Sequence, residues 1–183
     1  LCGHSDAMGG LLCGKAELVD KVFRFREING ASLNPDPAYL IGRGMKTLEL
    51  RIERQNVSAL KIAQYLKSHA KVIDVYYPGL ASHKGHDIAK SQMRGFGGMM
   101  SFAIKGDYNA VKKFLPSLKL VHLAASLGSV STLAGPPRTT SHVELSEAQR
   151  KQLGIPESLI RYSVGIENVD DLIKDLDDAL AAI

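Results

Sequence analysis

The chain has 183 residues, 45% hydrophobic and 23% charged, which is typical of a globular protein with a substantial core. Its net charge is +4, but basic and acidic residues are interspersed, so we expect no nucleic-acid partner. The two cysteines form no CxxC pair, which suits a reducing compartment. No apolar run approaches the roughly 20 residues that span a bilayer, and no signal sequence is recognisable. We therefore expect a cytoplasmic protein with no membrane segment.

The first part of the chain predicts a strand, a helix and a loop. Residues 8–14, Met-Gly-Gly-Leu-Leu-Cys-Gly, have the composition of a short buried strand with glycines at both ends. Residues 15–25 have helical spacing. Residues 29–37 are rich in Asn, Gly, Ser and Pro, and they predict a loop that leads into a helix.

A long helical pattern follows. Between residues 38 and 69, apolar side chains recur every three or four positions with charged residues between them. This predicts one long helix, or two helices broken at Gly42 or Gly44. Because such a helix can connect two domains, we place a domain boundary inside it, with one domain at residues 1–50 and a second at residues 51–183.

The remainder of the chain mixes strands and helices. Four segments have the composition or alternation of β-strands: residues 72–77, 99–104, 120–124 and 160–166. Residues 108–118 have helical spacing, and a final helix begins after Asn168, which suits an N-cap. Because strands and helices do not alternate strictly, the pattern predicts an α+β domain with a mainly antiparallel sheet.

Two motifs invite a functional interpretation that the sequence does not support. The pair His83 and His86 has no recognisable third metal ligand and lies in a polar stretch, which favours exposed loop histidines. The run Gly95-Phe96-Gly97-Gly98 lacks the lysine of a phosphate-binding loop and precedes a strand. We therefore interpret it as a turn at the start of a strand.

Arg161 is a better candidate. Alternation within residues 160–165 puts Arg161 and Ser163 on one face of a strand, and a guanidinium there presents a planar fork that suits a carboxylate. A surface or salt-bridged arginine is the alternative, and the residues alone favour it. Residues 124–129 could hold an anionic oxygen, and residues 135–142 could line a cleft or simply cross the surface.

A set of motifs in one order resembles a known family. They are Gly3-His4-Ser5-Asp6, Arg43-Gly44-Met45-Lys46, Tyr76-Tyr77-Pro78-Gly79, Gly97-Gly98-Met99-Met100, Ala125-Ser126-Leu127-Gly128, Thr140-Ser141-His142 and Arg161-Tyr162-Ser163-Val164-Gly165. The set resembles the C-terminal half of the Cys/Met-metabolism enzymes that depend on pyridoxal 5'-phosphate (PLP), a family that includes cystathionine γ-synthase, cystathionine γ-lyase and methionine γ-lyase.

The resemblance implies an α/β fold overall, the PLP-dependent transferase fold type I. Residues 1–50 would then end the large PLP-binding domain, and residues 51–183 would form the small C-terminal domain. It also implies that Arg161 binds the substrate α-carboxylate with help from Ser126, and that Ser141 borders the substrate pocket. The Schiff-base lysine is expected two positions before Leu1, and the PLP would be bound mainly by residues outside this chain, in the N-terminal half.

The implied reaction is γ-elimination or γ-replacement on a sulfur amino acid or O-acyl-homoserine, in a homotetramer. A cystathionine β-lyase is an alternative, and a non-catalytic C-terminal binding or assembly domain is an alternative of another class. Ala125 stands where many cystathionine-handling members have Glu. Loss of that carboxylate counts against a strict cystathionine enzyme and leaves a methionine γ-lyase, an O-acyl-homoserine sulfhydrylase or a relaxed lyase open.

Overall fold

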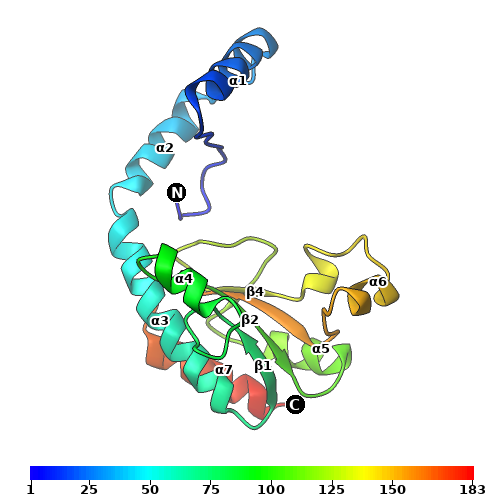
Figure 1. The fold of residues 1–183 in the computed structure, drawn as a ribbon. Helices are drawn as coiled ribbons and strands as arrows, with labels where there is room; N and C mark the ends of the chain where they lie inside the picture. Colours follow the sequence, from blue (N-terminus) through cyan, green and yellow to red (C-terminus); the bar gives the residue numbers. More distant parts are fainter. The chain divides into compact units, whose positions relative to one another are not determined.

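The computed structural model describes residues 1–183, which form two compact units, Leu1–Leu48 and Glu49–Ile183. Unit 1 contains two helices, α1 (Ala16–Asn29) and α2 (Pro35–Met45). Both helices are labelled in Figure 1. The Asn34 side chain caps α2 by accepting from the Asp36 amide at 3.1 Å, next to a proline at the first helical position. The predicted helix at residues 15–25 is confirmed and extends four residues further.

Two predictions for unit 1 are wrong. Residues 8–14 form no strand, and Met8 and Leu11 are 87% and 72% exposed. A strand needs a neighbour to accept its backbone hydrogen bonds, and no strand of this chain pairs with the segment. The helical pattern breaks at residues 46–47, not at Gly42 or Gly44. Gly44 is inside α2, where a Cβ atom would lie 2.4 Å from the Cys2 carbonyl oxygen, so it permits close packing.

Unit 2 is built on one five-stranded sheet. Its strands are β1 (Val72–Tyr76), β2 (Met99–Ile104), β3 (His122–Leu123), β4 (Leu133–Gly135) and β5 (Leu159–Ser163). They lie in the order β1-β2-β5-β4-β3, and every neighbouring pair is antiparallel except β3 and β4, which are parallel. The sheet is therefore mixed, with antiparallel pairing predominant as predicted.

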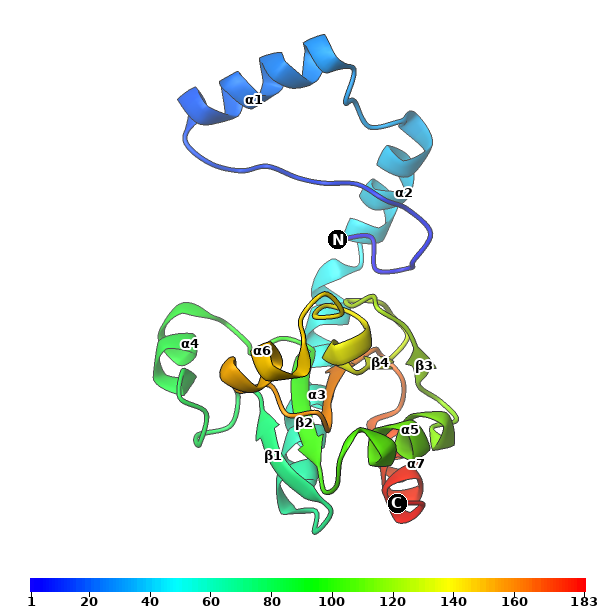
Figure 2. The same cartoon turned by 90° about the vertical axis from the view of Figure 1, so that its right-hand side faces the viewer.

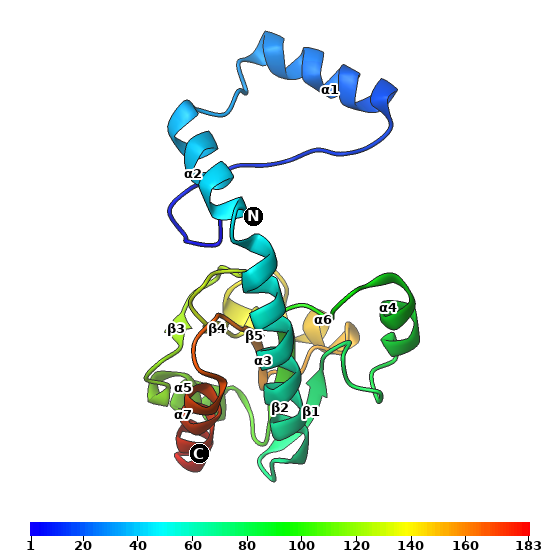
Figure 3. The same ribbon diagram turned by 90° about the vertical axis from the view of Figure 1, so that its left-hand side faces the viewer.

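Helices cover the sheet on both sides. They are α3 (Leu48–Ser68), α4 (His86–Gln92), α5 (Tyr108–Ser117), the 3₁₀ helix η1 (Pro137–Thr139), α6 (Glu147–Gln152) and α7 (Val169–Ala181). Figure 2 shows η1 and α6 in front of the sheet, and Figure 3, from the opposite side, shows α3 in front of it. No helix combines the length and the apolarity needed to cross a bilayer.

The core lies between the sheet and α3, α5 and α7. Phe102 of β2 is fully buried, and its ring centroid lies 6.0 Å from that of Phe114 and 6.1 Å from that of Tyr162. The helices contribute fully buried side chains, among them Ile62, Leu66, Val111, Leu172 and Leu176. The predicted burial of Met100, Phe102 and Ile104 in β2 is confirmed, and Met99 and Ser101 are only partly buried, whereas Ala103 is buried as well.

The histidine motif lies partly in a helix. His86 begins α4, its Nδ1 lies 2.8 Å from the Pro78 carbonyl oxygen, and its ring stacks on Phe96 at 5.5 Å. The prediction of a purely exposed loop is therefore wrong for His86. The predicted turn before β2 is confirmed. Gly97 has φ +79° there, and its amide donates to Asn56 at 2.7 Å.

Candidate functional site

The two faces of β5 have different roles. Ile160 and Tyr162 are fully buried on the core side, so Arg161 lies on the opposite face, on the side of η1 and α6. Ser163 shares that face and is 2% exposed. The neighbouring residue across β4 is Gly135, which has no side chain to fill the space next to Arg161. The strand therefore presents a half-buried guanidinium beside a small residue.

Arg161 is oriented by a loop that lies 35 residues away in the sequence. Its Nη2 donates to the carbonyl oxygen of Ser126 at 3.0 Å. Ser126 thus contributes its backbone, not its hydroxyl. No carboxylate of the chain forms an ion pair with Arg161, although seven ion pairs occur elsewhere. Of the predicted alternative, a surface or salt-bridged arginine, the salt-bridged form is therefore wrong within these 183 residues, while the Arg161–Ser126 hydrogen bond itself lies at the surface.

The Ser126 loop, which we define as residues 124–132, connects β3 to β4 and is held at several points. The hydroxyl of Ser163 accepts from the Gly128 amide at 2.8 Å. Gln55 of α3 donates through Nε2 to the Ser129 carbonyl at 3.0 Å. The Glu167 carboxylate accepts from the Thr132 amide at 2.6 Å and from its hydroxyl at 2.7 Å. Residues 125–128 between these points are exposed.

Ser141 lies in a separate segment. Its hydroxyl is 2.8 Å from His142 Nδ1, it is exposed, and it forms no hydrogen bond with Arg161 or Ser126. The preceding Thr140 approaches the site more closely, since a Cβ atom built on Gly135 would lie 3.4 Å from its methyl group. The structure therefore brings Arg161 and Ser126 together but does not bring Ser141 into contact with them.

A partly buried charge cluster fixes the segment that carries Ser141. Glu157 accepts from Arg150 Nε at 2.9 Å and also pairs with Arg138, whose guanidinium lies 4.5 Å from the centroid of the Tyr108 ring. Hydrogen bonding to Arg150 and the charge of Arg138 together lower the pKa of the Glu157 carboxyl. The cluster ties η1 and α6 to α5.

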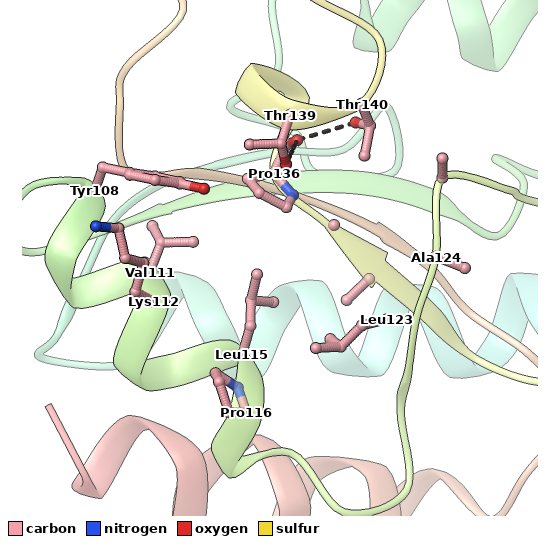
Figure 4. Close-up of a pocket in the computed structure, with 13 residues that line it drawn as sticks. Tyr108, Val111, Lys112, Leu115, Pro116, Leu123, Ala124, Pro136, Thr139 and Thr140 are labelled. Atoms are coloured by element: carbon pink, nitrogen blue, oxygen red, sulfur yellow. Dashed lines mark hydrogen bonds between the residues drawn. The ribbon is translucent and has the colours of Figure 1, made fainter. Parts of the chain in front are cut away.

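Ala125 lines a cavity of about 570 Å³ next to the Ser126 loop. In the close-up, Leu115 of α5 lies across from Leu123 of β3, with Tyr108 and Lys112 at one side and Thr140 at the other (Figure 4). The volume is within the range of small-molecule sites. The lining near Ala125 is mostly apolar, and the methyl group of Ala125 adds no charge to it.

The residues present fit the amino acid substrate of a PLP enzyme. A guanidinium with no internal carboxylate partner, on a rigid strand, is the donor expected for an α-carboxylate. Arg161 and residues 124–129 include no amine that could bond to the PLP aldehyde. These residues could therefore hold a substrate carboxylate, but they offer no amine for the PLP aldehyde.

Several residues that organise the site have no recognisable signal in the sequence. Gln55 belongs to the regular pattern of a helix, and nothing marks it as a donor to a loop 74 residues away. Glu167 follows β5 by four residues and could have been taken for a surface carboxylate. Ser163 is the exception, because its alternation with Arg161 places both side chains on the same face.

Comparisons with known proteins identify the family of the chain. The family model for Cys/Met metabolism PLP-dependent enzymes matches residues 1–181. Cystathionine gamma-synthase 1, chloroplastic, of Arabidopsis thaliana is 44% identical over 99% of this chain and 32% of its own length. L-methionine gamma-lyase of Fusobacterium nucleatum subsp. polymorphum is 46% identical over 99% of this chain and 46% of its own length.

A solved structure matches in fold as well. The cystathionine gamma synthase from Xanthomonas oryzae pv. oryzae, solved in complex with cystathionine, is 39% identical and has a TM-score of 0.93, covering 99% of this chain and 47% of that one. The expected type I PLP fold is thereby confirmed. The chain spans between about a third and a half of the length of these relatives. It belongs to the family of Cys/Met metabolism PLP-dependent enzymes.

Proposed function

We propose that this chain is the substrate-carboxylate-binding, C-terminal part of an enzyme that performs γ-elimination or γ-replacement on a sulfur amino acid or an O-acyl-homoserine. In the proposal, residues 1–50 end the PLP-binding domain and residues 51–183 form the C-terminal domain. The observation that carries it is Arg161, whose one hydrogen bond fixes its orientation and which has no carboxylate partner within the chain.

Arg161 would bind the substrate α-carboxylate and fix its orientation. A guanidinium can hold both oxygens of an α-carboxylate through two parallel hydrogen bonds, which limits rotation of the substrate about its Cα. That rotation determines which Cα bond is labilised, so a fixed carboxylate selects the bond. When bound, PLP supplies an electron sink for the electrons of that bond. The chain's own part is to hold the carboxylate and to keep it in one orientation.

Ala125 supports a substrate with an uncharged side chain. It lines the mostly apolar cavity beside the Ser126 loop and brings no carboxylate that could pair with a distal ammonium group. Although neither Arg161 nor Ser126 lines the cavity, the proposal places the substrate side chain on the Ala125 side of the loop, where methionine and O-acyl-homoserine fit better than cystathionine does. We expect the complete enzyme to be a homotetramer in the cytoplasm, and the exposed apolar side chains of unit 1 support contacts with further polypeptide.

The test uses the complete polypeptide with PLP. The Arg161→Ala and Arg161→Lys variants are compared with the original enzyme. The measurement is turnover of methionine, cystathionine and O-acyl-homoserine, with analysis of the products. We expect kcat/KM to fall by about 100-fold or more for Arg161→Ala, because a charged hydrogen-bonded contact and the orientation it imposes are both lost. Arg161→Lys should recover little, since an ammonium lacks the fork.

The matched control is Arg94→Ala, which removes an exposed arginine far from β5 in sequence and should leave kcat/KM within about twofold. Near-normal kinetics for both Arg161 variants would contradict the role of Arg161. A complete polypeptide that shows no visible absorption band after incubation with PLP would instead favour a non-catalytic binding or assembly module.

A further inference from the structure

Ser163 connects the Ser126 loop to the strand that carries Arg161. Residues 161 and 163 lie on the same face of β5, about 7 Å apart along the strand. Arg161 reaches the loop at the Ser126 carbonyl, and Ser163 reaches it at the Gly128 amide, at 3.0 and 2.8 Å respectively. One strand therefore holds both the proposed substrate-binding group and the loop that orients it.

The Ser163 contact is specific because of the backbone of Gly128. Gly128 has φ +73°, a conformation that costs little for glycine and more for other residues. This conformation turns the Gly128 amide towards the buried Ser163 hydroxyl. Ser163 is 2% exposed, whereas Gly128 is exposed, so this bond anchors an exposed loop residue to a buried residue of the strand. Loss of the hydroxyl would leave a loop amide without its partner.

Gln55 of α3 holds the next residue of the loop, Ser129. It is 3% exposed and donates to the Ser129 carbonyl from α3. The loop is thus fixed at two consecutive residues, by β5 and by α3, directly after the exposed stretch that includes Ser126. The carbonyl that accepts from Arg161 is only two residues from the first of these points. Movement at Gly128 would therefore displace the Ser126 carbonyl.

The orientation of Arg161 depends on that carbonyl. An arginine has five N–H donors in a rigid fork, and one of them is given to Ser126. That single bond sets the rotation of the guanidinium plane and leaves the remaining donors for a carboxylate. Without it, the long side chain would sample several rotamers, and some of its binding free energy would be lost to ordering.

We propose that Ser163 is a positioning residue: through Gly128 it fixes the Ser126 carbonyl, which orients Arg161 for the substrate carboxylate. Gln55 supports the same loop from α3. This inference rests on the proposed function, because it assumes that Arg161 binds the carboxylate. In this proposal, Ser163 holds the Ser126 loop in a fixed position relative to β5.

The test is a double-mutant cycle in the complete enzyme with PLP. We expect Ser163→Ala to lower kcat/KM for the amino acid substrate by about 5- to 50-fold, mainly through KM, with the visible absorption of the cofactor retained. Ser163→Thr keeps the hydroxyl and should restore most of the activity. In the Arg161→Ala background, Ser163→Ala should have little further effect, because Ser163 acts through Arg161.

The matched control is Ser58→Ala, which removes a fully buried serine hydroxyl of α3 that has no hydrogen-bond partner. It should leave the kinetics unchanged. If Ser163→Ala does not yield folded protein, Gln55→Met tests the same loop from α3, with the same cycle and a similar but smaller expected rise in KM.

The outcomes separate this inference from the proposed function. If Arg161→Ala has its large effect and Ser163→Ala has none, the positioning role is wrong and the proposed function stands. If Ser163→Ala costs the same activity with and without Arg161, Ser163 acts structurally and the inference is also wrong. If Arg161→Ala itself is near normal, the proposed function fails first.

Discussion

Units 1 and 2 are built from similar elements but differ in what those elements bury. In unit 2, α7 places Leu172 and Leu176 in the core, where both are fully buried. In unit 1, α1 is one residue longer, has its own apolar residues, and buries none of them. Phe25 is 67% exposed and Ile28 is 87% exposed. A helical pattern therefore determines where a helix forms, but burial requires an opposing surface.

The described residues provide no such opposing surface for many apolar side chains of unit 1. Soluble monomers rarely expose large contiguous apolar patches, whereas single exposed apolar residues are common. Unit 1 exposes a concentrated set: Met8, Leu11, Leu12, Leu18, Val22, Phe23, Phe25 and Ile28. Since the relatives are two to three times as long, we propose that the rest of a PLP-binding domain covers these side chains.

The largest expected difference between the units is in how much the free energy of unfolding falls when a phenylalanine of each unit is replaced by alanine. In the 183-residue chain, Phe102→Ala should lower the free energy of unfolding by about 3–5 kcal/mol, because it leaves a cavity between Phe114 and Tyr162. Phe25→Ala should change it by less than about 0.5 kcal/mol, because the ring is mostly in water. Urea denaturation followed by circular dichroism measures both.

The same pair of variants sharpens the interpretation of unit 1 when it is repeated in the complete polypeptide. If other residues cover α1 there, Phe25→Ala should become clearly destabilising. Equal, small effects of Phe25→Ala in the short and the complete polypeptide would contradict the proposed cover over α1.

Removing a carboxylate from an ion pair should also affect the stability of the two units differently, by an intermediate amount. Glu157 of unit 2 is shared by two arginines, whereas Asp20 of unit 1 forms one exposed pair with Arg24 at 3.0 Å. At pH 7, Glu157→Gln should cost about 1–3 kcal/mol, and Asp20→Asn less than about 0.5 kcal/mol. Thermal unfolding of both variants at low and high salt checks these values.

The Glu157 effect should also depend on pH. Because the folded state lowers the pKa of this carboxyl, its contribution is fully present above the ordinary carboxyl pKa of about 4 and is lost as the pH falls through the lower, folded-state value. The difference in free energy of unfolding between the original chain and the Glu157→Gln variant should therefore shrink as the pH is lowered. A gap that stays constant down to about pH 2 would show that the carboxylate charge is not the cause.

The sequence predicts those parts of the fold that depend on local pattern. Asn168 caps α7 as expected, accepting from the Asp170 amide at 2.8 Å, and the alternation of Met100, Phe102 and Ile104 describes β2 correctly. The sequence does not predict β4, which is only three residues long and too short for a periodic pattern. The helix α6 was missed, although Ser146 and Gln149 form a capping box that the sequence contains.

The site was predictable only in part, for a related reason. The alternation around Arg161 and Ser163 follows from the strand itself, so their shared face could be predicted. The contact between Arg161 and Ser126 depends on the register of β4 and β5 and on the path of a loop between β3 and β4, neither of which a local pattern contains. The donor to Ser129 lies 74 residues from it, and pairing over such a distance needs the tertiary structure.

The smallest expected difference concerns one hydroxyl in each unit. Tyr162 is fully buried, its hydroxyl has no hydrogen-bond partner, and burial raises its pKa well above the ordinary value. Tyr162→Phe should therefore raise the free energy of unfolding by about 1 kcal/mol, because an unsatisfied polar group is removed from the core without loss of packing. Tyr39 of unit 1 is 70% exposed, and Tyr39→Phe should have no measurable effect. Urea denaturation at pH 7 compares the two variants, and a destabilised Tyr162→Phe variant would mean that its hydroxyl is hydrogen-bonded in solution, for example by a buried water.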